Sequence, residues 1–231
     1  MKLLELLNVT KTYCQGEALS VAVQDISVTI ERGEFTAFAG SSGSGKTTLL
    51  NLMGGLDIPT SGKVMLDDVE LSTLSSKELA NIRKRRMGFV FQTFNLLPVL
   101  TGLENVEYPL LRLGLSAKEI KNKSLEAIAR VGLQNVMHHR PNQMSGGQRQ
   151  RVAIARAIVH KPNIIFADEP TANLDKKTAS EIIELMKSLN EENAVTFIFS
   201  THDSMIMAEA KRIIQISDGQ IIKEEQKPQK C

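Results

Sequence analysis

A glycine-rich segment, Gly40-Ser-Ser-Gly-Ser-Gly-Lys-Thr47, constrains the fold of this chain more than any other feature. The run Glu34–Ala39 before it is typical of a short buried strand, and Thr48–Met53 after it is typical of the first turns of a helix. Glycines at this spacing let the backbone wrap a phosphate group with its N–H groups pointing inward, and the helix N-terminus adds positive charge. Because a flexible Ser/Gly linker would not stand between a strand and a helix, the sequence predicts a phosphate-binding loop.

Alternating strand and helix patterns predict the fold class. Two further continuous apolar runs, at 163–167 and 194–199, are typical of parallel strands covered on both faces. Between them, apolar side chains recur on one helical face at Ile182, Leu185, Met186 and Leu189. The chain has 231 residues, of which 42% are hydrophobic, so it can bury a sizeable core. We expect an α/β protein with a parallel sheet.

The middle of the chain has a helical pattern instead. Ser-x-x-Glu segments begin at Ser75 and Ser116, and this spacing is typical of a capping box at a helix N-terminus. Apolar stripes follow within 120–129 and 152–159. These patterns predict a mainly helical insertion over residues 93–160.

Two features are expected near the C-terminus. Asp218-Gly219 lies between two apolar runs and predicts a hairpin turn. Beyond it, Lys223–Cys231 is polar and predicts a frayed tail.

Charge, hydropathy and cysteine usage argue against several classes of protein. The formal net charge is +2, whereas a dedicated nucleic-acid-binding protein is usually strongly basic. No apolar run approaches the length of a membrane span, and residues 1–30 lack a signal-peptide layout. Cys14 and Cys231 make no disulfide framework, so we expect reduced thiols in a cytosolic protein.

Adjacent carboxylates end one of the predicted buried strands. Asp168 and Glu169 follow Ile164–Ala167, where Asp168 can hold Mg²⁺ through a water and Glu169 can polarise an attacking water. In the phosphate loop, Lys46 should reach the β- and γ-phosphates and the Thr47 hydroxyl should bind the metal. An acidic corner that caps a helix is the alternative for the carboxylates, and their combination with the loop favours the catalytic interpretation.

A second helix N-terminus suited to phosphate follows Met144-Ser-Gly-Gly-Gln148. Its glycines allow close backbone approach, and Ser145 can cap the helix. A single nucleotide needs only one such helix end. The second end is therefore expected to serve a nucleotide held by another copy of the chain.

These motifs, in this order, resemble the ATP-binding cassette (ABC) ATPases, and the resemblance covers residues 1–222. It implies a P-loop NTPase with a RecA-like parallel-sheet core, an N-terminal antiparallel β subdomain and a helical subdomain. The core with its β subdomain would comprise 1–92 and 161–222, the helical subdomain 93–160, and a polar tail 223–231. One departure is Met144, where the family signature usually begins with Leu; we expect no loss of function because both are apolar.

The resemblance also implies ATP and Mg²⁺ as cofactors and assigns site residues. The implied catalytic residues are Glu169, His202 and Gln92, and the implied metal ligands are Thr47, Gln92 and Asp168. The implied nucleotide-binding residues are Tyr13, Gly40, Ser41, Ser42, Gly43, Ser44, Gly45, Lys46, Thr47, Thr48, Ser145, Gly146, Gly147, Gln148 and Asp175. Taken alone, Gln92 would be a polar strand end, His202 a helix cap and Tyr13 a surface tyrosine.

Several segments resemble the lipoprotein-release and macrolide-export branch of the family, including 91–98, 103–110 and 140–148. That branch implies a head-to-tail homodimer on the inner face of the cell membrane, peripheral to a separate four-span permease with a large extracytoplasmic domain, and no nucleic-acid partner. The apolar segment Phe94–Leu100 would either pack under the helical insertion or line a groove for the permease. The basic run Arg83–Arg86 is expected near lipid headgroups.

Three rival functions share the phosphate loop. A cell-division-type signalling ATPase would regulate wall enzymes through its membrane partner and would differ only in that partner. A DNA-repair ATPase would carry a long coiled coil between the loop and Met144, and no sustained heptads occur there. A small-molecule kinase would have no use for Met144–Gln148.

Overall fold

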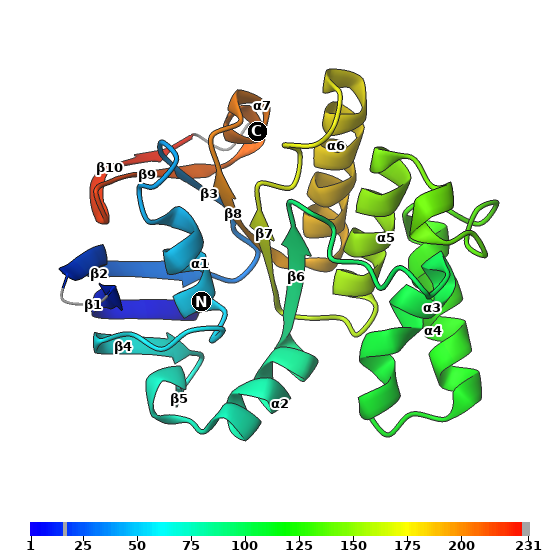
Figure 1. The fold of residues 1–231 in the computed structure, drawn as a ribbon, viewed down its shortest axis with the longest axis horizontal. Coiled ribbons are helices and arrows are strands. Elements are labelled where there is room, and N and C mark those ends of the chain that lie inside the picture. The colour runs from blue at the N-terminus through cyan, green and yellow to red at the C-terminus, as the bar shows by residue number, and fades with distance from the viewer. Residues whose placement is uncertain (16–17, 228–231) are drawn as a thin grey trace.

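Two β-sheets organise the chain, for which the computed structural model describes residues 1–15 and 18–227 (Figure 1). The antiparallel sheet has the order β2-β1-β4-β5, formed by Ala18–Glu31, Lys2–Gln15, Ser61–Leu66 and Val69–Glu70. The second sheet has the order β10-β9-β3-β8-β7-β6, formed by Gln220–Gln226, Arg212–Ser217, Phe35–Ala39, Thr196–Thr201, Ile164–Asp168 and Met87–Phe91. Its neighbouring strands are parallel except β10 and β9. This topology confirms the predicted α/β fold and its antiparallel β part.

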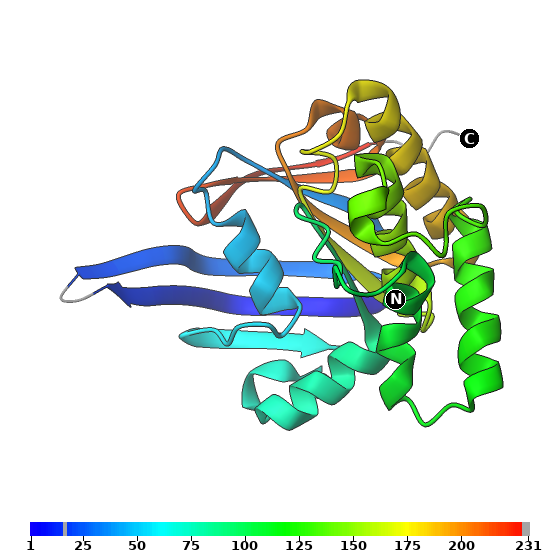
Figure 2. The same ribbon diagram turned by 45° about the vertical axis from the view of Figure 1, so that its right-hand side comes forward.

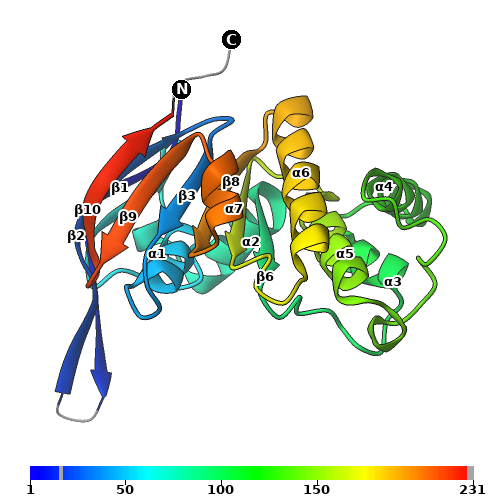
Figure 3. The ribbon, with the colours of Figure 1, turned by 90° about the horizontal axis from the view of Figure 1, so that it is seen from above.

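The parallel sheet is covered on both faces, as its continuous apolar strands predict (Figure 3). Successive side chains of a strand point to opposite faces, so Phe199 packs with helices α5 (Gly146–Ile158) and α6 (Lys176–Asn193). Ile198 packs on the other side with helix α1 (Lys46–Met53) and with the antiparallel sheet. Helix α1 therefore lies between the two sheets, and the phosphate loop enters it directly.

The remaining helices are α2 (Ser76–Arg86), α3 (Gly102–Glu107), α4 (Ala117–Arg130) and α7 (Ser204–Glu209), with the short 3₁₀ turns η1 (Leu71–Thr73), η2 (Tyr108–Arg112) and η3 (Pro141–Gln143). Of these, α3 and α4 lie with α5 in the region of the predicted helical insertion, residues 93–160. Both predicted capping boxes form, at Ser75 and Ser116. In Figure 2, α3 and α4 lie on the opposite side of the molecule from the projecting hairpin of β1 and β2.

The C-terminal hairpin forms, and the first residues of the predicted tail belong to a strand. Asp218 and Gly219 both have positive φ, +48° and +76°, which a tight turn between twisted strands requires. The expected frayed tail from Lys223 is wrong up to Gln226, because these residues extend β10 and pair with Arg212–Gln215 of β9. A polar composition is compatible with an edge strand whose side chains face water. The remainder, residues 228–231, lies outside the described residues.

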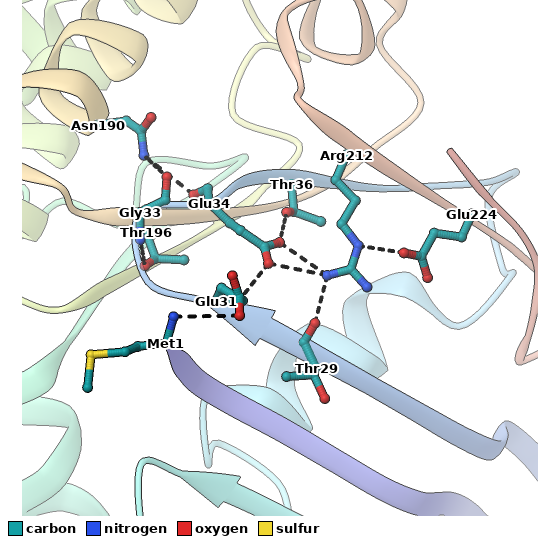
Figure 4. Close-up of polar contacts among 10 residues, drawn as sticks. All are labelled: Met1, Thr29, Glu31, Gly33, Glu34, Thr36, Asn190, Thr196, Arg212 and Glu224. Carbon is teal, nitrogen blue, oxygen red and sulfur yellow. Dashed lines mark hydrogen bonds and ion pairs between the residues drawn. The ribbon is translucent and has the colours of Figure 1, made fainter. Parts of the chain in front are cut away.

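One arginine joins the two sheets where β9, β10 and β2 meet (Figure 4). Nη1 of Arg212 donates to the carbonyl oxygen of Thr29 at 2.6 Å and lies 3.2 Å from Glu34 Oε2, while Nε donates to Glu224 Oε1 at 2.8 Å. Burial opposes the charge of Arg212, yet the two carboxylates together raise its pKa. The position of the antiparallel sheet against the parallel sheet is fixed partly by this half-buried charge cluster.

Candidate active site

The phosphate loop requires glycine at its two ends for different reasons. At Gly40, an added Cβ would lie 2.3 Å from the carbonyl oxygen of Ile216. At Gly45, φ is +99° and an added Cβ would lie 2.3 Å from the carbonyl oxygen of Ala22 on β2. A side chain at either position would therefore displace a strand. The loop is a backbone cradle held between the two sheets.

Two polar groups within this cradle fit a phosphate. Lys46 is buried and its Nζ donates to the carbonyl oxygens of Gly40 and Ser41, both at 2.8 Å, so its charge is held over the loop. The Ser44 hydroxyl is buried and has no hydrogen-bond partner among the described residues. A cation and an unpartnered hydroxyl in a glycine cradle match the donors that bind the phosphates of a nucleoside triphosphate.

Oxygen ligands for Mg²⁺ meet at the carboxyl end of β7. Thr47 Oγ1 donates to Asp168 Oδ1 at 3.2 Å, although the two residues are far apart in the sequence. Hydroxyl and carboxylate oxygens are the ligands that Mg²⁺ prefers in proteins. These two residues therefore fit the predicted metal site.

Glu169 has a strained backbone and a histidine partner. Its φ is +44°, a conformation rarely adopted by residues other than glycine, and its N–H donates to the carbonyl oxygen of Ser200 at 2.8 Å. Glu169 Oε1 lies 2.7 Å from His202 Nδ1, and Oε2 accepts from the Thr201 hydroxyl at 3.2 Å. The Glu169 side chain is 15% exposed, whereas that of His202 is 71% exposed. The carboxylate is thus fixed at the site while the imidazole reaches into solvent.

Lys46, Thr47, Glu169 and His202 line one cavity of about 390 Å³, whereas Ser44 and Asp168 are not among its lining residues. Its lining includes Ala22, Ser42, Gly43, Gly45, Lys46, Thr47, Thr48, Gln92, Glu169 and His202. The structure therefore brings the phosphate loop together with all three residues that were predicted to be catalytic. Ala22 is a lining residue that the sequence analysis missed, because only the pairing of sheets places β2 beside the loop.

The second predicted phosphate site does not border this cavity. Ser145 accepts from Gln148 N at 3.2 Å, and Gln148 Oε1 accepts from Ser145 N at 2.9 Å, so the segment forms a capping box at the start of α5. Gly147 is packed so closely that an added Cβ would lie 2.5 Å from Thr178 Cγ2. Within one chain, the two helix N-termini that were predicted to bind phosphate therefore do not border the same cavity.

Two other predicted residues are engaged in contacts within the chain. Asp175 caps α6 by accepting from Thr178, and the Thr178 hydroxyl and N–H lower the pKa of this carboxyl group. Tyr13 donates to Asp57 Oδ2 at 2.7 Å and does not line the cavity. Burial and the Asp57 carboxylate raise the Tyr13 pKa, so its hydroxyl stays protonated at neutral pH.

Another connection at the site could not be read from the sequence. The side-chain amide of Asn173 donates to the carbonyl oxygen of Gln92 at 2.9 Å. This bond joins the segment after Glu169 to the end of β6. Asn173 lies two residues before Asp175, and nothing in its local pattern points to Gln92.

Comparison with known proteins decides the family. A family model described as ABC transporter matches residues 23–172. The chain belongs to the ABC transporter family. This cassette is 47% identical over 227 residues to MJ0796 of Methanocaldococcus jannaschii, described as an uncharacterized ABC transporter ATP-binding protein, across 96% of this chain and 97% of that protein.

A solved structure and a longer relative extend this result. The cassette is similar to the dimeric structure of MJ0796 in a post-hydrolysis state bound to ADP and Pi, with a TM-score of 0.90, 46% identity and coverage of 97% of this chain and 98% of that chain. It is also 43% identical over 219 residues to the macrolide export ATP-binding/permease protein MacB of Bartonella henselae. That match covers 95% of this cassette and 33% of the longer protein.

The family settles the general activity and cofactors. The cassette is an ATPase that uses ATP and Mg²⁺, and the cradle at Gly40–Thr47 with the Thr47–Asp168 oxygen pair fits both. Among residues 1–15 and 18–227, no helix combines the length and the apolar character that a membrane span requires.

Proposed function

We propose that two copies of this cassette form a head-to-tail dimer that drives a separate membrane subunit. The observation that carries this proposal is the separation of two phosphate-seeking helix ends. The N-terminus of α1 borders the cavity, whereas Ser145–Gln148 at the N-terminus of α5 does not. A second copy turned head to tail would bring its Ser145–Gln148 to this cavity, and the dimeric MJ0796 structure supports such an assembly.

Each side chain in the cavity has a distinct task in this proposal. Lys46 neutralises the β- and γ-phosphates, and Thr47, Asp168 and Gln92 supply oxygen ligands for Mg²⁺. Glu169 accepts a proton from the attacking water, and His202 holds the terminal phosphate as a hydrogen-bond donor. The bound nucleotide supplies the bond that is broken. Asp175 and Tyr13 are assigned to the dimer interface and to the adenine side of the site.

The membrane subunit would dock in a groove of about 400 Å³ beside the edge strand β6, where residues of α2, η2 and the end of α5 also line it. Its apolar lining includes Leu56, Phe89, Phe91, Tyr108 and Pro109, and its basic rim includes Arg83 and Lys84. Of the predicted apolar segment 94–100, only Asn95 borders this groove, while Leu96 packs on the core. A cytoplasmic helix with an apolar face would fill such a groove.

We assign the membrane partner to the lipoprotein-release and macrolide-export type, a four-span subunit with a large extracytoplasmic domain. MacB supports this choice, because it is a macrolide export ATP-binding/permease protein and this cassette covers 33% of its length. The cassette would then lie in the cytoplasm, on the inner face of the membrane. Closure and reopening of the dimer would move the outer domain of the partner.

The dimer is tested with Glu169→Gln, which keeps the size of the side chain and removes the base. We expect hydrolysis to fall on the order of a hundredfold or more, and the variant to elute as a dimer at saturating ATP–Mg²⁺. Glu191→Gln on the exposed side of α6 is the matched control and should hydrolyse normally. Elution of Glu169→Gln as a monomer alone would refute the composite site.

The partner is tested by capturing tagged Glu169→Gln from gently solubilised native membranes and identifying bound proteins by mass spectrometry. A second bait carries Tyr108→Asp in addition, since Tyr108 is 52% exposed in the groove. Recovery of a four-span protein by the first bait alone supports the proposal. A regulator of wall enzymes would move the function to signalling, and an intact dimer without any membrane protein would exclude the transport role.

A further inference from the structure

The turn that follows β6 is strained at two neighbouring residues. Phe94 has a φ of +62° and Asn95 a φ of +48°, and neither residue is glycine. Left-handed backbone at two successive non-glycine residues persists only where surrounding contacts impose it. The turn 92–95 therefore needs an external clamp.

Helix α5 supplies that clamp through Arg156. Its Nη1 donates to the carbonyl oxygen of Asn95 at 2.5 Å, and its Nη2 donates to the carbonyl oxygen of Phe94 at 2.9 Å. The planar guanidinium thus bridges the two strained residues through two separate nitrogens held in a fixed fork. About two turns back toward the start of α5, Arg149 lies over the Phe94 ring, 5.1 Å from its centre.

The clamped turn lies between the two functional surfaces of the cassette. At its start, Gln92 lines the ATP cavity, and at its end Asn95 lines the groove together with Arg156. Within residues 1–15 and 18–227, the guanidinium of Arg156 forms no salt bridge and donates to the carbonyl oxygens of Phe94 and Asn95. A change at Arg156 therefore reaches Gln92 through only three intervening peptide units.

We propose that Arg156 is a positioning residue that holds Gln92 in the ATP cavity by clamping the strained turn 92–95. The same helix carries Ser145–Gln148 at its N-terminus, so the clamp also fixes Gln92 relative to the segment offered to the second copy. Arg156 contacts the carbonyl groups of the turn and none of the groups that line the cavity. Its effect on Mg²⁺ is exerted through Gln92, and this last step rests on the metal role proposed above for that residue.

The first test is made on the chain without nucleotide. Hydrogen exchange at the turn is compared between the parent chain, Arg156→Gln and Arg151→Gln. Arg151 lies on the same helix but donates to Val131 O and pairs with Glu181, away from the turn, so Arg151→Gln is the matched control. We expect the amide groups of Phe94 and Asn95 to exchange at least tenfold faster in Arg156→Gln only. Equal exchange in all three chains would overturn the clamp, whatever the cassette transports.

The second test asks whether Gln92 is the residue that Arg156 positions. Arg156→Gln is expected to raise the Mg²⁺ concentration for half-maximal protection by ATP against thermal unfolding by about tenfold, as loss of an outer partner of a metal ligand does. In the background of Gln92→Ala the same substitution should have no further effect on this concentration. An equal fold-change in both backgrounds would assign Arg156 a merely structural role.

A third variant covers the case in which Arg156→Gln folds poorly. Arg156→Lys keeps the positive charge but replaces the two guanidinium nitrogens, which contact Phe94 and Asn95 separately, by a single nitrogen. It should show an intermediate rise in the Mg²⁺ requirement with a melting temperature close to that of the parent chain. A normal Mg²⁺ requirement in this variant would overturn the need for a planar guanidinium at this position.

Discussion

At the scale of single residues, the active site contains positions whose backbone conformation restricts the side chains that they can carry. Gly45 and Glu169 both have positive φ. At Gly45, an added Cβ would in addition clash with a carbonyl oxygen. The conformation of Glu169 is held by its N–H bond to Ser200 and by the contacts of its carboxylate. The free-energy cost of a positive φ and the cost of a steric clash can therefore be measured separately at this site by substitution.

Gly45→Ala should destabilise the cassette more than Gly43→Ala. Both positions have positive φ, so each alanine costs about 1–2 kcal/mol in backbone strain. Nothing lies within 4 Å of a Cβ at Gly43, whereas a Cβ at Gly45 would meet Ala22 O at 2.3 Å. Chemical denaturation and ATP binding should show the larger loss for Gly45→Ala. Equal losses of stability would mean that β2 shifts to accommodate the added methyl group at no cost in free energy.

His160 should make stability depend on pH. Burial lowers its pKa and outweighs the opposing contact of Nε2 with Met87 O at 3.0 Å, while Nδ1 has no partner among the described residues. The unfolded chain therefore takes up a proton near pH 6.5 that the folded chain resists, so stability is present above that pH and falls as the pH decreases. The slope from one proton is at most about 1.4 kcal/mol per pH unit.

This dependence is measured by denaturant unfolding between pH 7.5 and 5. His160→Gln should lose less stability on acidification than the parent chain, whereas replacement of the exposed His138 by Gln should leave the slope unchanged. Parallel profiles for all three chains would exclude His160 as the cause.

At the scale of elements, helix N-termini determine much of the local architecture. The same capping box occurs at α2, α3, α4 and α5, with Ser or Thr as the cap and Glu or Gln three residues later. At α4, the hydroxyl and N–H of Ser116 lower the pKa of Glu119. At α5 the reciprocal residue is Gln148, which brings no negative charge to a helix end proposed to meet phosphate.

Ser116→Ala and Ser145→Ala should lose similar stability and differ in activity. Each removes one N-cap acceptor, which costs about 1 kcal/mol. Ser116 lies at α4, away from the cavity lining, so hydrolysis should be unchanged there. Ser145→Ala should lower the rate of hydrolysis by about tenfold or more, because a donor to the phosphate of the second copy is lost. Equal rates for both variants would contradict the proposed role of α5.

Local patterns predicted these elements well because their causes are local. The loop at Gly40–Thr47, the caps at Ser75 and Ser116 and the turn at Asp218 each depend on residues close together in the sequence. The strand Lys223–Gln226, by contrast, exists because β9 offers an edge. The lining residue Ala22 and the clamp at Arg156 follow from contacts between distant segments. Contacts between distant segments produce no regular residue spacing, so a single sequence does not reveal them.

At the scale of the whole molecule, the ATP cavity is built from both sheets. Lys46, Glu169 and His202 come from the parallel-sheet part, and Ala22 comes from the antiparallel sheet. Any movement of one sheet against the other would change the cavity. Arg212 opposes such movement because its guanidinium contacts Thr29 of one sheet and Glu224 of the other.

Arg212→Met should therefore weaken both folding and nucleotide binding. Loss of Arg212 leaves the Glu34 carboxylate without its cationic partner, and for this half-buried pair the cost should be roughly 2 kcal/mol, between that of a surface pair and that of a fully buried pair. Glu224→Gln, at the more exposed partner, should cost less than 1 kcal/mol, as surface ion pairs do. Thermal unfolding and ATP titration check both variants. Reduced stability of Arg212→Met with unchanged ATP affinity would mean that the sheets are aligned by other contacts.

The approach of Ala22 to Gly45 has a consequence for building chimeric proteins. The carbonyl oxygen of Ala22 occupies the space that a side chain on the loop would need, so a strand of one sheet sets the width of a loop that belongs to the other. A graft of Gly40–Thr47 onto a foreign parallel sheet would bring the glycines and lysine but not this outer wall. The smallest transplantable ATP-binding unit in this molecule is the loop together with β1 and β2.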